Sequence, residues 1–331
     1  MPAAKAASRL LPLAWLLPLA VAVAGLAWMV SVLAPLAPRA PLILGVGPWI
    51  GYEPFVLARE QGWLGPRVRL VETLSNTETS QSLRDGSIDI AGVTLDEAIR
   101  LRSDGVPVRI IAALSDSRGA DAVVLAPGVA GLADLRGQPV LVEASAVGFH
   151  MLHSALASVG LDNTDVRIVQ VQSTLIPPRW RAGDAAAAVV YEPMLSRLLG
   201  EGARVGFSTA DHPGLVLDVL VARESLIADQ RPELAEVLAA WEQGVVAFAS
   251  PERLPLEMLA AGAGLDAAGY RDALAGVAFI DGAASRRMLA GDKPGLAAAA
   301  DAVAESLRAA GMAADLRVDG KLLAPEVAGP P

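Results

Sequence analysis

The chain has 331 residues, of which 53% are hydrophobic and 19% charged, and this balance excludes a disordered protein. Its formal net charge is -9, and Lys5 and Arg9 are the only charges before Arg39, so the body of the chain is acidic and a poor partner for nucleic acid or an anionic membrane. The absence of cysteine excludes disulfides, thiolate metal sites and lipid attachment at a cysteine.

The first predicted element is an uncharged segment from Leu10 to Leu36, preceded by two basic residues. This is the arrangement of a signal sequence or an N-terminal membrane anchor, with the rest of the chain outside the cytoplasm. The small-x-small cleavage site, Ala22-Val-Ala24, would leave a long apolar tail. The length of the segment therefore favours an uncleaved hydrophobic helix that tethers the protein to the inner membrane through residues 10–36, with a linker up to residue 40.

Beyond this linker, apolar runs of strand length alternate with helical patterns. The alternation predicts βαβ units and a mostly parallel sheet in an α/β fold. Capping signals at Ser75–Glu78 and Thr94–Glu97 mark two helix starts, and helices dominate after Glu224. Strands are predicted at residues 42–46, 68–72, 88–93, 108–114, 121–126, 140–143, 166–171, 186–190 and 218–222.

The loop Gly47–Pro54 joins the first of these strands to a helical segment. In open α/β sheets ligands bind outside the carboxyl ends of the strands, so this loop is a candidate binding element. Trp49 and Tyr52 are candidates to stack on a ligand or to surround a cationic group, and Glu53 is a candidate polar contact. The alternatives are that Trp49 only packs the loop and that Glu53 stabilises a helix N-terminus.

A weak internal repeat relates residues 84–96 to residues 181–193. Each copy has a helix end, a glycine, a buried strand and a polar loop. If two similar lobes face each other, Thr94 and Asp96 lie on one wall of a cleft, and Tyr191 and Glu192 lie on the other. Thr94 also suits a helix cap, whereas Glu192 follows an apolar strand and is the strongest charged candidate.

Several motifs, in this order, resemble the nitrate/sulfonate/taurine type of ABC-transporter substrate-binding proteins, a superfamily that includes binding proteins for thiamine-pyrimidine precursors. The resemblance runs from about residue 42 to residue 311. The motifs are Trp49-Ile-Gly-Tyr-Glu-Pro54, Gly86-Ser-Ile-Asp-Ile-Ala91, Thr94-Leu-Asp-Glu-Ala98, Asp134-Leu-Arg-Gly137, Val190-Tyr-Glu-Pro193 and Asp218-Val-Leu-Val221.

The resemblance implies a type II periplasmic binding protein fold, in which two α/β lobes clamp a ligand in the cleft between them and close about a hinge. It places the first lobe at 41–117 and 215–312, the second at 118–214, and a C-terminal tail at 313–331. The two crossovers are expected near 116–120 and 213–218.

Further candidates lie at these crossovers and at strand ends. Ser115 and Asp121 flank the first crossover and Asp218 lies at the second, while Glu143 ends a strand. Ser145 opens a helix whose free backbone donors could bind an anionic group. The alternative for these residues is an ordinary turn or a solvated loop.

Acidic residues outnumber basic ones in these loops, and this favours a ligand with an amine or another cationic donor over a bare anion such as nitrate. Taurine satisfies both ends, with its amine on a carboxylate and its sulfonate on helix N-termini. His150 and His153 share a helix face without further metal ligands, so neither a metal nor a cofactor is expected.

These observations predict a monomeric, periplasmic or otherwise extracytoplasmic solute-binding component of an ABC importer, working with a permease and its ATPase. Its ligand would be a small organic solute, either taurine- or sulfonate-like or bearing an amine or aminopyrimidine. An alternative is a ligand-sensing periplasmic domain for a membrane signalling partner. A pyrimidine-synthase-like enzyme is disfavoured by the export segment and by the lack of cysteine, of a Gly-x-Ser-x-Gly elbow, of a P-loop and of a His-Glu-x-x-His pattern.

Overall fold

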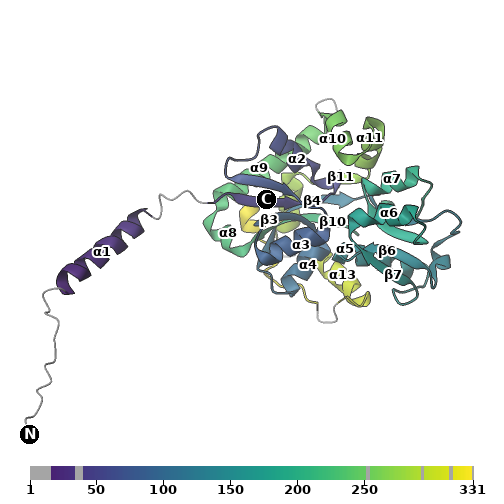
Figure 1. Ribbon diagram of the computed structural model, residues 1–331, viewed down its shortest axis with the longest axis horizontal. Coiled ribbons are helices and arrows are strands. Elements are labelled where there is room, and N and C mark those ends of the chain that lie inside the picture. The colour runs from purple at the N-terminus through teal and green to yellow at the C-terminus, as the bar shows by residue number, and fades with distance from the viewer. Residues whose placement is uncertain (1–15, 34–39, 251–253, 292–293, 313–315, 330–331) are drawn as a thin grey trace, which may run out of the picture. The chain divides into compact units, whose positions relative to one another are not determined.

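The computed structural model describes residues 16–33, 40–250, 254–291, 294–312 and 316–329, and the chain divides into two units (Figure 1). The first unit, Met1–Ala40, contains helix α1 (Leu16–Leu33). Among the described residues, no helix has both the length and the apolar character of a membrane span. The predicted span, 10–36, extends beyond α1 at both ends into residues that lie outside the described part. The second unit, Pro41–Pro331, contains the other elements.

The second unit is built on two β-sheets, each with its own helices. The larger sheet has six strands in the order β11-β4-β10-β3-β1-β2. We call this sheet and its helices the six-stranded lobe. Its strands are β1 (Leu42–Val46), β2 (Val68–Glu72), β3 (Ile90–Thr94), β4 (Val108–Ser117), β10 (Leu217–Arg223) and β11 (Val277–Phe279). Its helices are α2 (Glu53–Glu60), α3 (Asn76–Asp85), α4 (Leu95–Ser103), α8 (Glu224–Asp229), α9 (Arg231–Phe248), α10 (Leu256–Ala263), α11 (Ala267–Ala275), α12 (Gly282–Leu289), α13 (Gly295–Ala309) and α14 (Pro325–Ala328).

The smaller sheet has five strands in the order β7-β6-β8-β5-β9. Together with α5, α6 and α7 it forms the five-stranded lobe. Its strands are β5 (Asp121–Leu125), β6 (Pro139–Glu143), β7 (Arg167–Val171), β8 (Ala187–Tyr191) and β9 (Arg204–Ser208). Its helices are α5 (Ala146–Ala157), α6 (Ile176–Arg181) and α7 (Met194–Gly200).

Both sheets are mixed, which differs from the mostly parallel sheet that the alternation of elements predicts. β10 runs antiparallel to β3 and β4, and β5 runs antiparallel to β8 and β9. The reason is the path of the chain between the lobes. β3, β4 and β8 end at the lobe interface, whereas β5 and β10 begin there: Asp121 pairs with Tyr191 and Asp218 pairs with Thr94. Strand ends from both sheets therefore meet at one place.

The chain crosses between the lobes at residues 118–120 and 209–216. Thr209 of the second crossing ties both segments together, because its Oγ1 accepts from the Gly119 backbone N–H at 2.9 Å and lies 2.8 Å from Ser117 Oγ. Gly276 lies against the first crossing, where a Cβ would come within 2.9 Å of the Ala120 backbone nitrogen. These contacts bring the two crossings side by side, as a two-stranded hinge requires.

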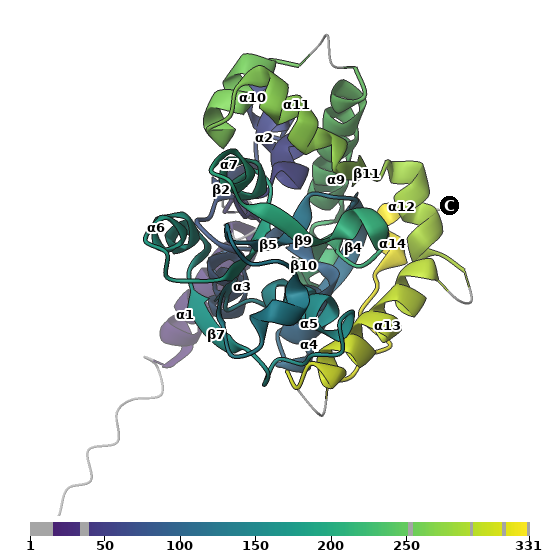
Figure 2. The same cartoon turned by 90° about the vertical axis from the view of Figure 1, so that its right-hand side faces the viewer.

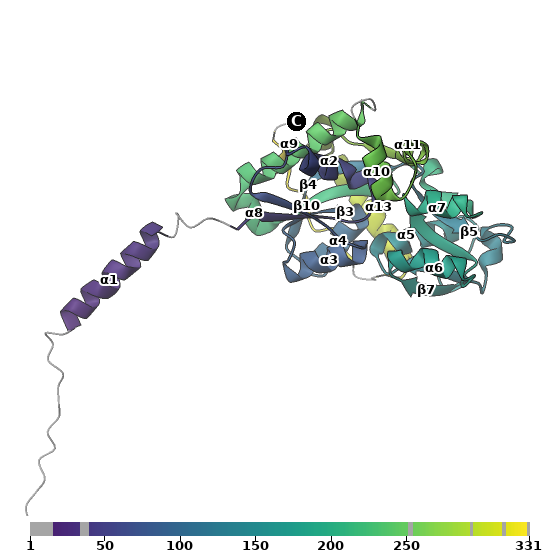
Figure 3. The same cartoon turned by 45° about the horizontal axis from the view of Figure 1, so that its top comes forward.

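Each face of the six-stranded sheet is covered by helices. In Figure 3, α2 and α9 lie above the strands of this sheet, and α3 and α4 lie below them. The side-chain alternation of β10 follows the same division: Leu220 packs with Phe55 and Trp241 on one face, while Val219 and Val221 pack with α4 and α13 on the other. Each fully buried aliphatic side chain of this kind contributes about 1.5–3 kcal/mol.

The five-stranded sheet is covered in the same way, by α5 on one face and by α6 and α7 on the other. Helix α13 packs against both α4 and α5, so it contacts the two lobes (Figure 2). His150 of α5 is part of this junction: its Nδ1 lies 3.1 Å from Ser306 Oγ on α13 and its Nε2 lies 3.2 Å from the Leu215 carbonyl oxygen.

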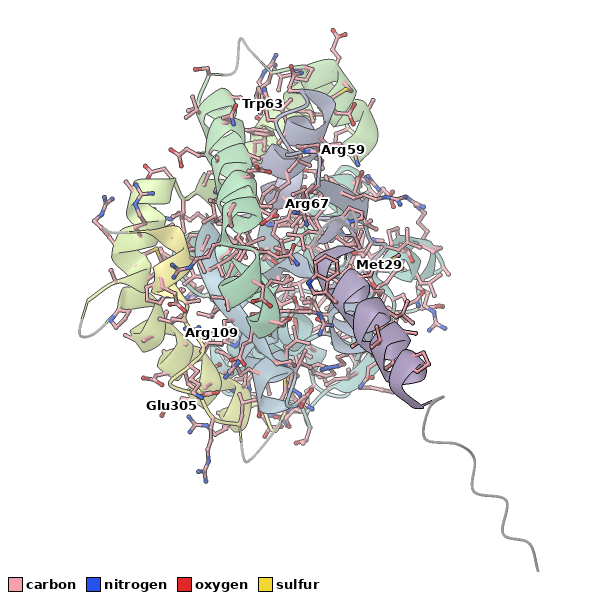
Figure 4. The ribbon with its side chains drawn as sticks, turned by 90° about the vertical axis from the view of Figure 1, so that its left-hand side faces the viewer. Met29, Arg59, Trp63, Arg67, Arg109 and Glu305 are labelled. Atoms are coloured by element: carbon pink, nitrogen blue, oxygen red, sulfur yellow. The ribbon has the colours of Figure 1, made fainter. Side chains whose placement is uncertain are left out.

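Residues 316–329, within the segment expected as a tail, pack on the six-stranded lobe. The backbones of Ile110 and Leu323 form a parallel bridge, and Leu322 and Ala324 are buried. Arg109 of β4 donates to the Lys321 carbonyl at 2.9 Å and pairs with Glu326 at 2.6 Å (Figure 4). This segment therefore packs against β4 near Arg109 and Ile110.

Candidate ligand-binding site

The carboxylate of Asp218 organises the aromatic loop. Asp218 lies at the start of β10 and is 1% exposed. It accepts three hydrogen bonds, from Trp49 Nε1 at 3.0 Å, Tyr52 OH at 2.9 Å and Ser115 Oγ at 2.6 Å. Burial raises the pKa of Asp218 to about 6, and the three donors limit the rise because they stabilise the charged form. Trp49 and Tyr52 are thus held in place by one buried acid.

Two glycines make room for these rings. A Cβ on Gly51 would lie 2.0 Å from Trp49 Nε1, and a Cβ on Gly92 would lie 2.7 Å from the ring of Tyr52. Both distances are far inside van der Waals contact, and neither ring can move away without leaving Asp218. Gly51, the glycine of the Trp-Ile-Gly-Tyr motif, is therefore required because any side chain there would clash with the Trp49 indole.

Trp49 also contacts the opposite lobe. Its ring meets Tyr191 edge to face, with centroids 6.1 Å apart and planes at 84°. Tyr191 ends β8 of the five-stranded sheet, and both rings are buried. Trp49 and Tyr191 are therefore in direct contact across the lobe interface, a geometry that contributes about 0.5–1.5 kcal/mol beyond area burial.

A small cavity, here called the inner cavity, lies between the lobes beside these rings. Its volume is about 10 Å³, which is room for about one water molecule. It is lined by three aromatic residues, two acids and four other residues: Trp49, Tyr52, Tyr191, Asp121, Asp218, Asn76, Thr94, Val147 and Val216. Six of the sequence-predicted site residues thus come together around one space.

One carboxyl oxygen of the inner cavity lacks a hydrogen-bond partner. Asp121 is 5% exposed, and its Oδ2 is buried without a hydrogen bond. Burial raises the pKa of Asp121 to about 8; a hydrogen bond from Ser117 to the carboxyl group opposes the rise, and the nearby carboxylate of Asp218 adds to it. A buried carboxyl oxygen without a donor costs free energy.

A larger cavity, here called the outer cavity, adjoins the same aromatic residues and has a volume of about 340 Å³. It shares Trp49, Tyr52 and Tyr191 with the inner cavity. Its charged lining residues are Glu53, Glu72 and Arg197. The remainder are Gly47, Pro48, Ile50, Val56, Ser173, Thr174, Pro177, Pro193, Met194, Gly262 and Ala263, so both lobes contribute.

Glu53 opens helix α2 and lines the outer cavity. Burial raises the pKa of Glu53 to about 7; Glu72 adds to the rise and Arg59 opposes it. Glu53 therefore occupies a helix N-terminus and also borders a cavity, and its contact with a ligand stays a prediction.

Glu143 joins the two lobes instead of lining either cavity. Its Oε1 accepts from Thr77, both from the backbone N–H at 2.9 Å and from the hydroxyl at 3.0 Å, and Tyr191 OH lies 3.5 Å from its Oε2. Thr77 is in the first turn of α3, so a carboxylate of one lobe occupies a helix N-terminus of the other. Burial raises the pKa of Glu143 while these donors oppose the rise.

Three further predicted residues, Asp96, Ser145 and Glu192, line neither cavity. Glu192 accepts from the Ser196 backbone N–H at 3.1 Å and from its hydroxyl at 2.8 Å, and so caps α7. Ser145 caps α5 by accepting from the Gly148 N–H at 3.2 Å. Asp96, in the first turn of α4, is buried beside the site but lines neither cavity, and burial raises its pKa to about 7. Each of these residues lies at or next to the N-terminus of a helix: α7 for Glu192, α5 for Ser145 and α4 for Asp96.

Two residues of this region, Arg197 and Thr77, are not among the sequence-predicted candidates. Arg197 follows Pro193 by four residues and so lies one helical turn beyond the Tyr191-Glu-Pro193 loop, and Thr77 lies inside the predicted capping signal at Ser75–Glu78. Both positions could be found by extending each loop by one turn of the next helix. Within the described residues, no group of three or more His, Asp or Glu side chains is placed to hold a metal ion.

Comparisons with known proteins agree with this architecture. The alkanesulfonate-binding protein SsuA of Xanthomonas axonopodis pv. citri, solved bound to MOPS, has a TM-score of 0.72 at 18% identity, over 85% of this chain and 96% of that one. The periplasmic aliphatic sulphonate-binding protein SsuA of Escherichia coli gives 0.67 at 17%, over 86% and 96%. The periplasmic nitrate-binding protein NrtA of Synechocystis PCC 6803 gives 0.62 at 16%, over 86% and 93%. The two-sheet periplasmic binding protein fold is thus confirmed.

At the level of sequence, the chain is 25% identical over 167 residues to the taurine-binding periplasmic protein of Escherichia coli strain K12. The match spans 50% of this chain and 52% of that relative, or about half the length of each. The model of the NMT1-like family matches residues 36–252. The chain therefore belongs to the NMT1-like family, and its predicted resemblance to ABC-transporter substrate-binding proteins of the nitrate/sulfonate/taurine type is confirmed.

Proposed function

We propose that this protein is the extracytoplasmic solute-binding component of an ABC importer, and that it holds a small organic solute through an ammonium or similar cationic donor. The observation that carries the proposal is Asp121, a buried carboxyl group with an unpartnered oxygen in a cavity lined by three aromatic residues. A cationic donor would supply the missing partner through a charge-assisted hydrogen bond, and aromatic rings stabilise a cation further.

The charges of the site favour an amine-bearing solute over a bare anion. The inner cavity is lined by two aspartates and by no basic side chain, so nitrate would find no cation there and would be repelled by the Asp218 carboxylate. The Escherichia coli relative is named a taurine-binding protein, and taurine carries both an amine and a sulfonate. An aminoalkanesulfonate or an aminopyrimidine fits this balance, and catalysis is not part of the role.

Solute entry requires the lobes to separate. The inner cavity has a volume of only about 10 Å³, too small for an organic solute, and Glu143 and Trp49 each join one lobe to the other. We expect residues 41–117 with 215–312, and residues 118–214, to move as two bodies about the crossings at 118–120 and 209–216. Closing on the solute then presents both lobes to a permease that works with an ATPase.

The proposed location follows from the N-terminal segment. Residues 10–36 would direct the chain across the inner membrane and keep it tethered there, with the monomeric body in the periplasm or its equivalent. Cell fractionation with protease treatment of intact spheroplasts tests this: the body should be digested from outside while the tether stays in the membrane. A body found in the cytosol would contradict the proposal.

The ligand class is tested by calorimetric titration of the purified protein with taurine, ethanesulfonate, nitrate, an aminopyrimidine and a polyamine. We expect amine-bearing compounds to bind. Asp121→Asn should weaken their binding by about tenfold or more, as loss of a hydrogen bond to a charged group does. Asp184→Asn, an exposed change on the same lobe, is the control and should leave affinity unchanged. Binding of bare anions alone would contradict the proposed ligand class.

A further inference from the structure

Arg197 is a partly buried cation that has no carboxylate partner among the described residues. It lies on α7 of the five-stranded lobe and lines the outer cavity. Its Nη2 donates to the carbonyl oxygen of Ala263, the last residue of α10 in the six-stranded lobe. Its Nε is buried and has no hydrogen-bond partner. Burial raises the pKa of Glu192 and the charge of Arg197 opposes that rise, but the guanidinium group forms no ion pair among the described residues and retains a free donor.

The position of Arg197 is built into the fold. The next residue after Ala263 is Gly264, with φ +66°, and a Cβ there would lie 2.9 Å from Arg197 Nη2. A positive φ favours glycine, and the absence of a side chain leaves the guanidinium room at the C-terminus of α10, where a cation is stabilised by the helix dipole. Arg197 is thus held by Nη2, while its buried Nε lies beside Gly264 and has no hydrogen-bond partner.

The acids of the outer cavity do not neutralise Arg197. Glu72 pairs with Arg59, with 2.6 Å between Nη1 and Oε1. Glu53 makes no ion pair among the described residues, and burial raises its pKa to about 7, so it is only partly ionised near neutral pH. Of the residues that line the inner and outer cavities, Arg197 is the only basic one. The two cavities therefore differ in charge: acids line the inner one, and an unpaired cation borders the outer one.

Both cavities are lined by Trp49, Tyr52 and Tyr191, so they adjoin these same three rings. We infer that Arg197 receives the anionic group of a zwitterionic solute whose ammonium group lies toward Asp121. The inference rests on the proposed function and narrows it, because an amine without an anionic group would leave Arg197 unpaired. It also assigns the anion to a side chain on α7, whereas the sequence analysis expected helix N-termini.

Such a solute would also strengthen closure. Arg197 already reaches from the five-stranded lobe to the end of α10 in the six-stranded lobe. An anion bound to the guanidinium group would fix its plane and so hold Nη2 on the Ala263 carbonyl. Binding of the anionic end is therefore coupled to this contact between the lobes.

The test compares matched compounds by calorimetric titration of the purified full chain. Ethylamine has only the amine, ethanesulfonate only the anion, and 2-aminoethanesulfonate both; propylamine and 3-aminopropanesulfonate extend the series by one carbon. We expect one of the aminosulfonates to bind at least about tenfold more tightly than the amine of the same length. This comparison uses the unmodified protein and does not depend on the folding of a variant.

Arg197→Met should remove that advantage, lowering the affinity for the aminosulfonate by about 10- to 100-fold while the affinity for the amine stays the same. Arg287→Met, an exposed change on α12 that touches neither cavity, is the control and should change neither affinity. If amines and aminosulfonates bind equally well to the unmodified protein, the inference is overturned and the proposed function stands. If neither binds, both are overturned.

Discussion

Thr77 and Glu143 hold the two lobes together through a carboxylate seated at a helix N-terminus. The backbone N–H and the hydroxyl of Thr77 both donate to the same oxygen of Glu143, at 2.9 and 3.0 Å. Glu143 is 3% exposed, whereas Thr77 lies at the surface, so the contact is partly buried. The contact is formed without a solute, and we expect it to favour closure of the ligand-free lobes.

Glu143→Ala should shift the ligand-free protein toward an open form. Loss of the carboxylate leaves Thr77 without its partner across the interface and costs about 1–3 kcal/mol of closure. Small-angle scattering of the ligand-free variant should give a larger radius of gyration than the unmodified protein.

Thr77→Val is the graded companion, because it removes the hydroxyl and keeps the backbone donor. We expect a smaller shift, corresponding to about 1 kcal/mol. Equal scattering curves for Glu143→Ala and the unmodified protein would show that other contacts set closure.

Gly51→Ala should displace the Trp49 indole, because the added Cβ would lie 2.0 Å from Nε1. The indole would lose its hydrogen bond to Asp218, and the free energy of unfolding should fall by about 1–3 kcal/mol. Denaturant unfolding measures this change, and a shift in tryptophan emission should accompany it.

Gly200→Ala is the matched control, since a Cβ at the end of α7 meets no atom within 4 Å. It should be neutral or stabilise the protein by about 0.4–1 kcal/mol. A loss of stability as large as that of Gly51→Ala would show that the clash is not the cause.

Asp121 should make the ligand-free protein less stable as the pH rises. Burial raises its pKa to about 8 from an ordinary value of 3.8, so the folded protein keeps a proton that the unfolded chain releases. The free energy of unfolding therefore decreases between these two values. In Asp121→Asn, the decrease between about pH 5.5 and 7.5 should be smaller by about 1–3 kcal/mol. In the control Asp184→Asn, the free energy of unfolding should decrease with pH as it does in the unmodified protein. The same decrease in Asp121→Asn would contradict the prediction.

His150 should have the opposite effect at lower pH. Burial lowers its pKa to about 4 from an ordinary value of 6.5, so the unfolded chain takes up a proton that the folded protein does not. Its contribution to stability is therefore lost as the pH falls between these values. His150→Gln should weaken this acid-dependent loss in chemical denaturation, whereas His212→Gln, at an exposed position, should not. Identical acid dependence in the two variants would contradict the assignment.

The regular elements were largely readable from the sequence, because buried strands are continuous apolar runs between turn residues. β1 and β2 have the predicted bounds, and the other predicted strands differ by a few residues at their ends. β9 and β11 were not predicted. β9 is an edge strand with Gly206 at its centre and only Phe207 buried, and β11 has only three residues, so neither has an apolar run to reveal it.

Site residues could be predicted from the sequence where both the residue type and a position at the end of a strand indicate ligand binding. Trp49, Tyr52, Asp121, Tyr191 and Asp218 all follow or begin strands that meet at the lobe interface, and all of them line the inner cavity. Which of them touch a solute stays a prediction.

Only the tertiary structure decided which partner each charged side chain has. Glu192 and Arg197 lie five positions apart, and by sequence the acid was the stronger candidate. In the folded protein Glu192 accepts a hydrogen bond from Ser196 of the helix that follows it. Arg197 donates to a backbone carbonyl of the other lobe, and its Nε has no hydrogen-bond partner. The sequence by itself determined the strands, the aromatic loops and the acidic balance, because these depend on local pattern. The assignment of each charge to a partner depends on distances between segments far apart in the chain, and packing alone sets those distances.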